Sequence, residues 1–271
     1  MSENHTQYCG LAATPVNLPI WREAFWPAEW LQLRTSPLYQ GVDIPKADGD
    51  PVVLIPGFLA SDTSLLEMHG WLERIGYDAY TSGFGRNIDC PDVLLARLLE
   101  KVETVRKESA GRPVSLIGHS LGGSLARAAA VLRPDLVAQV ITLGSPIRDV
   151  RIHPLVMGLA RIIERATPSP DEQPRQHDDH VHGGSCTRKL TDAMLQPFPS
   201  QVPRTSIYSR TDGVVDWHSS EDTVPGVNIE VRATHIGLIF NREVYNQIAR
   251  LLASADPAAW TQAPVAATAT A

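Results

Sequence analysis

The chain has 271 residues and a formal net charge of -6; 43% of its residues are hydrophobic and 20% are charged. This composition is ordinary for a globular protein, and the acidic balance without a long basic run excludes the electrostatic pattern of a nucleic-acid binder or of an anionic-membrane binder. No apolar run approaches the roughly 18 residues that a membrane-spanning helix needs, so we expect no transmembrane segment.

The N-terminus and the cysteines bear on the cellular location. Residues 1–10 are polar and lack the basic-then-apolar pattern of a signal peptide. Cys9, Cys90 and Cys186 are widely spaced and form no C-x-x-C pair, which argues against a zinc site. We therefore expect a cytoplasmic protein with reduced thiols; a Cys90–Cys186 disulfide is the alternative if the protein is exported.

Residues 1–50 are predicted to form an N-terminal extension. Aromatic residues recur in it at roughly helical spacing, with charged residues between them: Trp21, Phe25, Trp26 and Trp30, with Arg22, Glu23 and Glu29. This pattern predicts an amphipathic helix whose aromatic face covers one flank of the main domain. An interfacial or substrate-entrance element is the alternative.

The main domain is predicted to comprise residues 51–146 and 204–255. Strands are expected at 51–57, 77–80, 114–117, 137–143, 205–208 and 228–232, and helices at 61–76, 91–109, 122–130 and 242–253. Strands that alternate with helices predict an α/β fold with a mostly parallel sheet covered by helices on both faces.

Residues 147–203 interrupt this alternation. They contain an apolar helical segment from Leu155 to Ile163, a polar tract from Pro168 to Gly184 and a second short helix near Cys186 to Leu195. Such a long diversion is unusual for a plain loop, so we interpret it as a cap or lid insertion over the active face. Residues 256–271 are rich in Ala, Thr and Pro without a core pattern, which predicts a disordered tail.

The segment Gly118–His119–Ser120–Leu121–Gly122 matches the G-x-S-x-G pattern of a nucleophile elbow. A strand that turns directly into a helix forces the corner residue into a strained conformation. Side chains two residues to either side would collide there, which requires Gly118 and Gly122. The turn raises the Ser120 hydroxyl above the sheet edge, where the amides of the new helix also point. An ordinary glycine-rich turn is the alternative that the motif alone leaves open.

A nucleophilic serine needs a base and an orienting carboxylate. Asp212 follows the predicted strand 205–208, and His235 follows the predicted strand 228–232. The carboxyl ends of parallel strands meet at one edge of a sheet, so both residues are expected to reach Ser120. The chain order Ser, Asp, His is the order of the α/β-hydrolase arrangement.

Each of these residues has a rival nearby in the sequence. Asp216 lies one turn beyond Asp212 and is an alternative carboxylate. His218 and His119 are interpreted as structural histidines, and Ser145 as a turn residue before a proline.

From about Asp50 to Ala253 the chain resembles bacterial serine esterases and lipases of the α/β-hydrolase superfamily. The segments that carry the resemblance are the elbow, Pro56–Gly57–Phe58, Leu143–Gly144–Ser145–Pro146, Thr211–Asp212–Gly213–Val214–Val215 and Thr234–His235. The resemblance implies that Ser120 is the nucleophile, His235 the general base and Asp212 its partner. It also implies that the backbone amides of Phe58 and Leu121 form the oxyanion hole.

The resemblance implies a serine carboxylic-ester hydrolase that forms an acyl-enzyme on a small-molecule or lipid ester and uses no cofactor. Calcium-dependent lipases carry an acid two residues after the catalytic histidine, where this chain has Gly237, so no metal site is implied. An acyltransferase or a thioesterase with the same triad is the alternative enzyme. A catalytically silent binding module is the alternative of another class.

Overall fold

A computed structural model describes residues 6–8, 11–166 and 188–254. The predicted polar tract from Pro168 to Gly184 and the predicted tail 256–271 lie outside the described residues.

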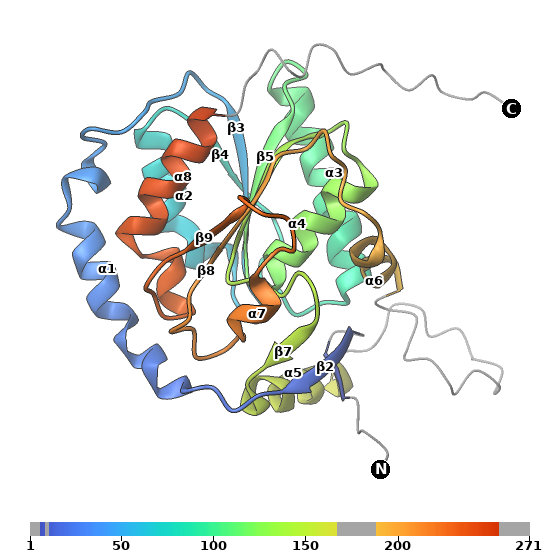
Figure 1. Cartoon of the computed structure of the whole chain (residues 1–271). Helices are drawn as coiled ribbons and strands as arrows, with labels where there is room; N and C mark the ends of the chain where they lie inside the picture. Colours follow the sequence, from blue (N-terminus) through green and yellow to red (C-terminus); the bar gives the residue numbers. More distant parts are fainter. Residues whose placement is uncertain (1–5, 9–10, 167–187, 255–271) are drawn as a thin grey trace, which may run out of the picture.

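A six-stranded sheet forms the centre of the molecule (Figure 1), and every neighbouring pair of its strands is parallel. In spatial order the strands are β4 (Asp78–Thr81), β3 (Pro51–Ile55), β5 (Val114–His119), β6 (Val137–Leu143), β8 (Arg204–Tyr208) and β9 (Asn228–Glu230). Strands β3, β5 and β6 are buried along their whole length, as expected for the centre of a doubly covered parallel sheet. Because all six strands run the same way, the carboxyl ends of β5, β6 and β8 lie at one edge, where the predicted site residues follow.

Helices cover both faces of the sheet (Figure 1), as the alternation of elements predicts. One face carries α1 (Trp26–Arg34), α2 (Leu66–Arg74) and α8 (Arg242–Ser254), and the other carries α3 (Pro91–Glu108), α4 (Leu121–Leu132) and α6 (Arg188–Leu195). Under the first layer, the rings of Trp71 and Tyr245 pack with centroids 4.6 Å apart. The short helices are η2 (Pro37–Gln40), η3 (Asp62–Leu65), α7 (Trp217–Ser220) and η5 (Ile236–Ile239).

The N-terminal region differs from the single aromatic-faced helix that the sequence predicts. A 3-10 helix, η1 (Ile20–Phe25), precedes α1, so the helical spacing changes between them. As a result Trp21 and Phe25 are 64% and 57% exposed, and their predicted role in covering the domain is wrong. Trp26 does pack on the domain, with its ring 5.3 Å from that of Phe240.

A second, three-stranded sheet was not predicted from the sequence. It consists of β1 (Thr6–Tyr8), β2 (Leu11–Pro15) and β7 (Val150–Ile152), with β2 in the middle. The strands are too short to show the two-residue hydrophobic period, and the pairing of β2 with β7 joins segments far apart in the sequence. This small sheet ties the N-terminal region to the segment that follows β6.

The described parts of residues 147–203 lie in two different places. Helix α5 (Pro154–Ala166) packs against the small sheet through Met157 and Ala160. Helix α6 instead packs beside α3 and α4, with its first amides held by the Asp92 carboxylate. Of the helices and strands described within residues 147–203, β7 and α5 therefore lie outside the two main helix layers.

Cys90 is disulfide-bonded, so the expectation of reduced thiols is wrong at this residue. Cys9 and Cys186 lie outside the described residues. Disulfides are typical of oxidising compartments, so this bond does not favour the predicted cytoplasmic location. Within the described ranges, no helix is both long and apolar enough to cross a bilayer.

Candidate active site

Ser120 lies at the corner between β5 and α4, at the carboxyl edge of the sheet. Its backbone has φ 52° and ψ −125°, a strained conformation for a residue with a side chain. A Cβ added to Gly118 would collide with the backbone of Gly122, and one added to Gly122 would collide with the carbonyl of Ile55 at the end of β3. Both glycines are therefore required by the sharp turn and by its close approach to the neighbouring strand.

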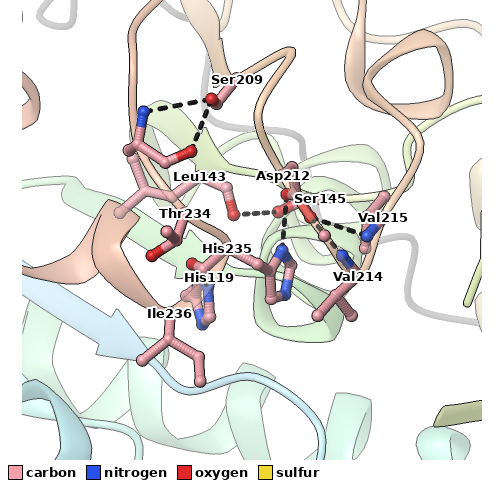
Figure 2. A network of polar contacts seen from close by, with 12 residues as sticks. His119, Leu143, Ser145, Ser209, Asp212, Val214, Val215, Thr234, His235 and Ile236 are labelled. Carbon is pink, nitrogen blue, oxygen red and sulfur yellow. Dashed lines mark hydrogen bonds and ion pairs between the residues drawn. The ribbon is translucent and has the colours of Figure 1, made fainter. Parts of the chain in front are cut away.

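Asp212 and His235 meet at the same edge. The imidazole Nδ1 of His235 lies 2.7 Å from Oδ2 of Asp212, and Figure 2 shows the two side chains facing one another. Both side chains are almost completely buried. The other carboxylate oxygen of Asp212 accepts the backbone N–H groups of Val214 and Val215, both at 2.8 Å. These bonds fix the carboxylate so that one oxygen is directed at the imidazole.

The rival residues have other partners. Asp216 forms an ion pair with Arg151 at 3.2 Å and contacts Nδ1 of His218 at 2.7 Å. The hydroxyl of Ser145 donates to the carbonyls of Gly118 and Leu143 (Figure 2 shows the bond to Leu143). None of these contacts brings a rival to the imidazole of His235.

The backbone brings Ser120 next to this pair. The N–H of Ser120 donates to the carbonyl of Leu143 at 2.9 Å, and a Cβ on the following Gly144 would lie 3.1 Å from Oδ2 of Asp212 and 3.3 Å from Nδ1 of His235. Among the hydrogen bonds of the described residues, none joins the Ser120 hydroxyl to His235. Such bonds are often long without substrate and tighten when it binds.

The surroundings of His235 favour its protonated form. Burial alone would lower the pKa of His235, but the charge and hydrogen bond of Asp212, with a smaller contribution from Glu23, raise it above its usual value. His119 lies beside it, with the ring centroids 4.7 Å apart, and its Nε2 donates to the backbone carbonyl of His235 at 3.0 Å. Burial lowers the pKa of His119 to about 3, so this ring stays neutral and adds no positive charge near the site.

Phe58 and Leu121 belong to the two segments that border the nucleophile. Leu121 is the first residue of α4, where backbone N–H groups lack helical partners. Phe58 follows β3, and a Cβ on the preceding Gly57 would lie 3.0 Å from Cβ of Ser120. The loop after β3 therefore runs directly against the elbow.

Asn87 supports this loop, a role that its sequence context does not predict. The residue is fully buried, and its side-chain amide donates to the carbonyl of Pro56 at 2.7 Å. Its backbone carbonyl accepts the N–H of Leu59, and its backbone N–H donates to the carbonyl of Ala60. The only sequence signal is an asparagine in a loop that follows a strand, which is more typical of a turn cap.

Two carboxylates of the N-terminal region also reach the backbone around His235. Glu23 accepts the N–H of His235, and Glu29 accepts the N–H of Thr234. The sequence showed these residues only as charges between aromatic residues, and no local pattern indicated that they point inward.

Residues 52–269 match the alpha/beta hydrolase family. The chain belongs to that family. This confirms the predicted fold, and the parallel sheet between two helix layers agrees with it.

Relatives of this α/β-hydrolase include lipases and a thioesterase. A triacylglycerol lipase of Burkholderia plantarii is 34% identical over 140 residues, which cover 47% of this chain but only 39% of the lipase. A mitochondrial palmitoyl-protein thioesterase of Homo sapiens is 23% identical over 237 residues, which cover 82% of this chain and 78% of the thioesterase. The structure of a monoacylglycerol lipase of Paleococcus ferrophilus matches with a TM-score of 0.53 at 19% identity, over 79% of this chain and 100% of that one.

The described part of the hydrolase contains no cluster of three or more His, Cys, Asp or Glu side chains arranged to hold a metal ion. A Cβ at Gly237, the position where calcium-dependent lipases carry an acid, would collide with the carboxylate of Glu29. The His and Asp residues between Pro168 and Gly184 lie outside the described residues.

Proposed function

We propose that the chain is a serine carboxylic-ester hydrolase of the esterase and lipase type, with Ser120 as nucleophile, His235 as general base and Asp212 as its partner. The observation that carries this proposal is the buried 2.7 Å contact between His235 and Asp212, at the same sheet edge as the strained Ser120. A strained serine next to a buried His–Asp pair is the arrangement that activates a hydroxyl for acyl transfer.

In the first step the Ser120 oxygen attacks the ester carbonyl while Nε2 of His235 takes the hydroxyl proton. Asp212 holds the tautomer with the proton on Nδ1 and stabilises the positive charge that develops on the ring. The negative charge moves to the carbonyl oxygen, where the amides of Phe58 and Leu121 donate to it. Each such donor is worth roughly 3 kcal/mol.

Collapse of the tetrahedral intermediate releases the alcohol, which receives the proton from His235 and leaves an ester between the acyl group and Ser120. Water then attacks this acyl-enzyme, with His235 again accepting a proton. The second collapse releases the carboxylic acid and returns the proton to Ser120. The cycle as proposed consumes one ester and one water and uses no cofactor.

The test combines covalent labelling with hydrolysis. A fluorophosphonate probe is expected to label the native chain at Ser120, and Ser120→Ala is expected to abolish both labelling and hydrolysis of short p-nitrophenyl esters while its circular dichroism stays native. Ser145→Ala is the matched variant, and it should keep the labelling. A native chain that is neither labelled nor active would be a binding module, and labelling that persists in Ser120→Ala would assign the nucleophile elsewhere.

A thioesterase is the second candidate, because the thioesterase relative aligns over most of both chains. The acyl-enzyme is the same for an oxygen ester and a thioester, so the two activities differ only in the leaving group, an alcohol or a thiol. Comparison of kcat/KM for an acyl thioester and the matching oxygen ester separates the two activities. Product analysis with an added alcohol or thiol detects transfer in place of hydrolysis.

We propose that α5 is the part of the predicted cap that meets apolar substrate. Leu155, Leu159 and Ile162 are spaced along one side of α5 and are 67%, 44% and 64% exposed. The exposed apolar side chains support a role of α5 in contacting acyl chains, since residues buried on the domain would be covered.

A further inference from the structure

Glu23 is a buried carboxylate outside the triad. It lies on η1 with 8% of its surface exposed. One of its oxygens accepts the backbone N–H groups of Gly213 and His235, both at 2.9 Å, and the other accepts the N–H of Ile236 at 2.8 Å. All three partners are donors, which matches the acceptor-only chemistry of an ionised carboxylate.

These three amides belong to the two loops that hold the acid and the base. Gly213 directly follows Asp212 after β8, while His235 ends the loop after β9 and Ile236 begins η5. A Cβ on Gly213 would lie 2.9 Å from the Glu23 carboxylate, so the acid loop touches η1 directly. A single carboxylate therefore fixes the backbone of both partners of the 2.7 Å contact between Asp212 and His235.

The negative charge of Glu23 is balanced by amides. In the described part of the chain, no Lys or Arg side chain forms an ion pair with it. The charged or titratable groups around His235 are Asp212, which binds its ring; Glu23, which binds its amide; Glu29, which binds the amide of Thr234; and His119, which stays neutral. Glu23 thus adds a second nearby negative charge that favours the imidazolium form.

We propose that Glu23 is a positioning residue for the ester hydrolysis described above: it holds the acid loop and the base loop in one geometry and stabilises the positive charge that forms on His235. This inference rests on the proposed function. It also makes the N-terminal extension a part of the active site, because η1 supplies a group that the core of the domain does not.

Two substitutions separate geometry from charge. Glu23→Gln keeps one oxygen for the amides of Gly213 and His235 but loses the charge and the bond to Ile236. Glu23→Ala loses all three bonds. We expect kcat to fall roughly 10-fold in Glu23→Gln and further in Glu23→Ala, with little change in KM, because small displacements of catalytic groups slow the chemical step. The acid limb of the kcat/KM profile should move to lower pH in both variants, because the imidazolium loses a stabilising charge.

Glu108→Gln is the matched control, since it removes the same charge from an exposed residue at the end of α3. It should leave kcat and the pH profile unchanged. A Glu23 that acts only as a structural brace would lower the midpoint of thermal unfolding in Glu23→Gln without moving the acid limb, and that result would overturn the proposal.

An NMR titration gives a readout that does not depend on activity. The ring signals of His235, assigned with a His235→Gln variant, should titrate at lower pH in Glu23→Gln than in the native chain and at the native pH in Glu108→Gln. A native chain without hydrolysis or probe labelling would refute the proposed function. An unchanged His235 titration in a folded Glu23→Gln protein would refute the role of Glu23.

Discussion

The carboxylate of Glu23 accepts the backbone N–H of His235 at 2.9 Å, although 212 positions separate the two residues in the sequence. The contact joins a short N-terminal helix to the loop that carries the proposed general base. A second carboxylate, Glu29 on α1, holds the preceding amide of Thr234 in the same way. The N-terminal extension therefore supports the site directly, beyond covering one flank of the domain.

Replacing Asp212 tests the proposed acid. Asp212→Asn keeps the shape of the side chain but presents an amide to the imidazole, which favours the wrong tautomer and removes the negative charge beside the ring. We expect kcat for a p-nitrophenyl ester to fall by roughly 10⁴-fold with little change in KM. Steady-state kinetics measure this loss.

Asp216→Asn is the matched variant for that experiment. The Asp216 carboxylate binds Arg151 and His218, so its replacement should change kcat far less than the replacement of Asp212. A larger loss in Asp216→Asn than in Asp212→Asn would assign the acid to Asp216.

The sequence was sufficient to locate the main fold because its signals are local. The apolar run before Ser120 and the two glycines around it predict a strand, a sharp turn and a helix, and β5 and α4 are found there. Asp212 and His235 were placed by their positions after two strands, because parallel strands bring such positions to one edge.

The supporting residues could not be found in the same way. Asn87 and Glu23 act through side-chain contacts with backbone groups at Pro56 and His235, and such contacts leave no period or spacing in the sequence. The 3-10 turn of η1 also shifted the helical spacing, which turned Trp21 outward and left a carboxylate, Glu23, as the buried residue of η1.

The burial of His119 should make the free energy of unfolding depend on pH. Burial keeps its folded-state pKa at about 3, below the ordinary value of 6.5. Between these values the unfolded chain binds a proton at this residue and the folded chain does not. The free energy of unfolding should therefore fall as the pH falls below 6.5, by up to about 1.4 kcal/mol per pH unit from this residue.

Replacement of the ring by an amide isolates this contribution. His119→Gln keeps a donor for the carbonyl of His235 but does not titrate. Urea unfolding from about pH 8 to about pH 4 should show a shallower acid decline in His119→Gln than in the native chain. Parallel declines in the two proteins would contradict the prediction.

Replacement of Asn87 is expected to lower kcat and to change KM, which reflects substrate binding, much less. Asn87→Ala removes the donor to the carbonyl of Pro56, which releases the loop that carries Phe58. Displacement of the proposed oxyanion donor, the Phe58 amide, should lower kcat by roughly 10- to 100-fold, because such a donor acts on the charge that develops in the transition state. Kinetics on a soluble ester should show the loss in kcat with a nearly constant KM. A loss confined to KM would instead assign Asn87 to substrate binding.

The exposed apolar side of α5 is expected to bind water-insoluble esters or the surface of their emulsion. The triple variant Leu155→Ser, Leu159→Ser and Ile162→Ser removes three side chains that are already exposed, so it should fold normally. We expect the triple variant to lose about 1.4 kcal/mol of apolar contact with an oil–water interface or an acyl chain. Its activity on an emulsified triglyceride should therefore fall about tenfold. Activity on soluble p-nitrophenyl acetate should stay at the native level. Leu195→Ser on α6, where the leucine is 80% exposed, is the matched control and should change neither activity. Equal losses on both substrates in the triple variant would mean that α5 shapes the catalytic site itself and does not meet apolar substrate.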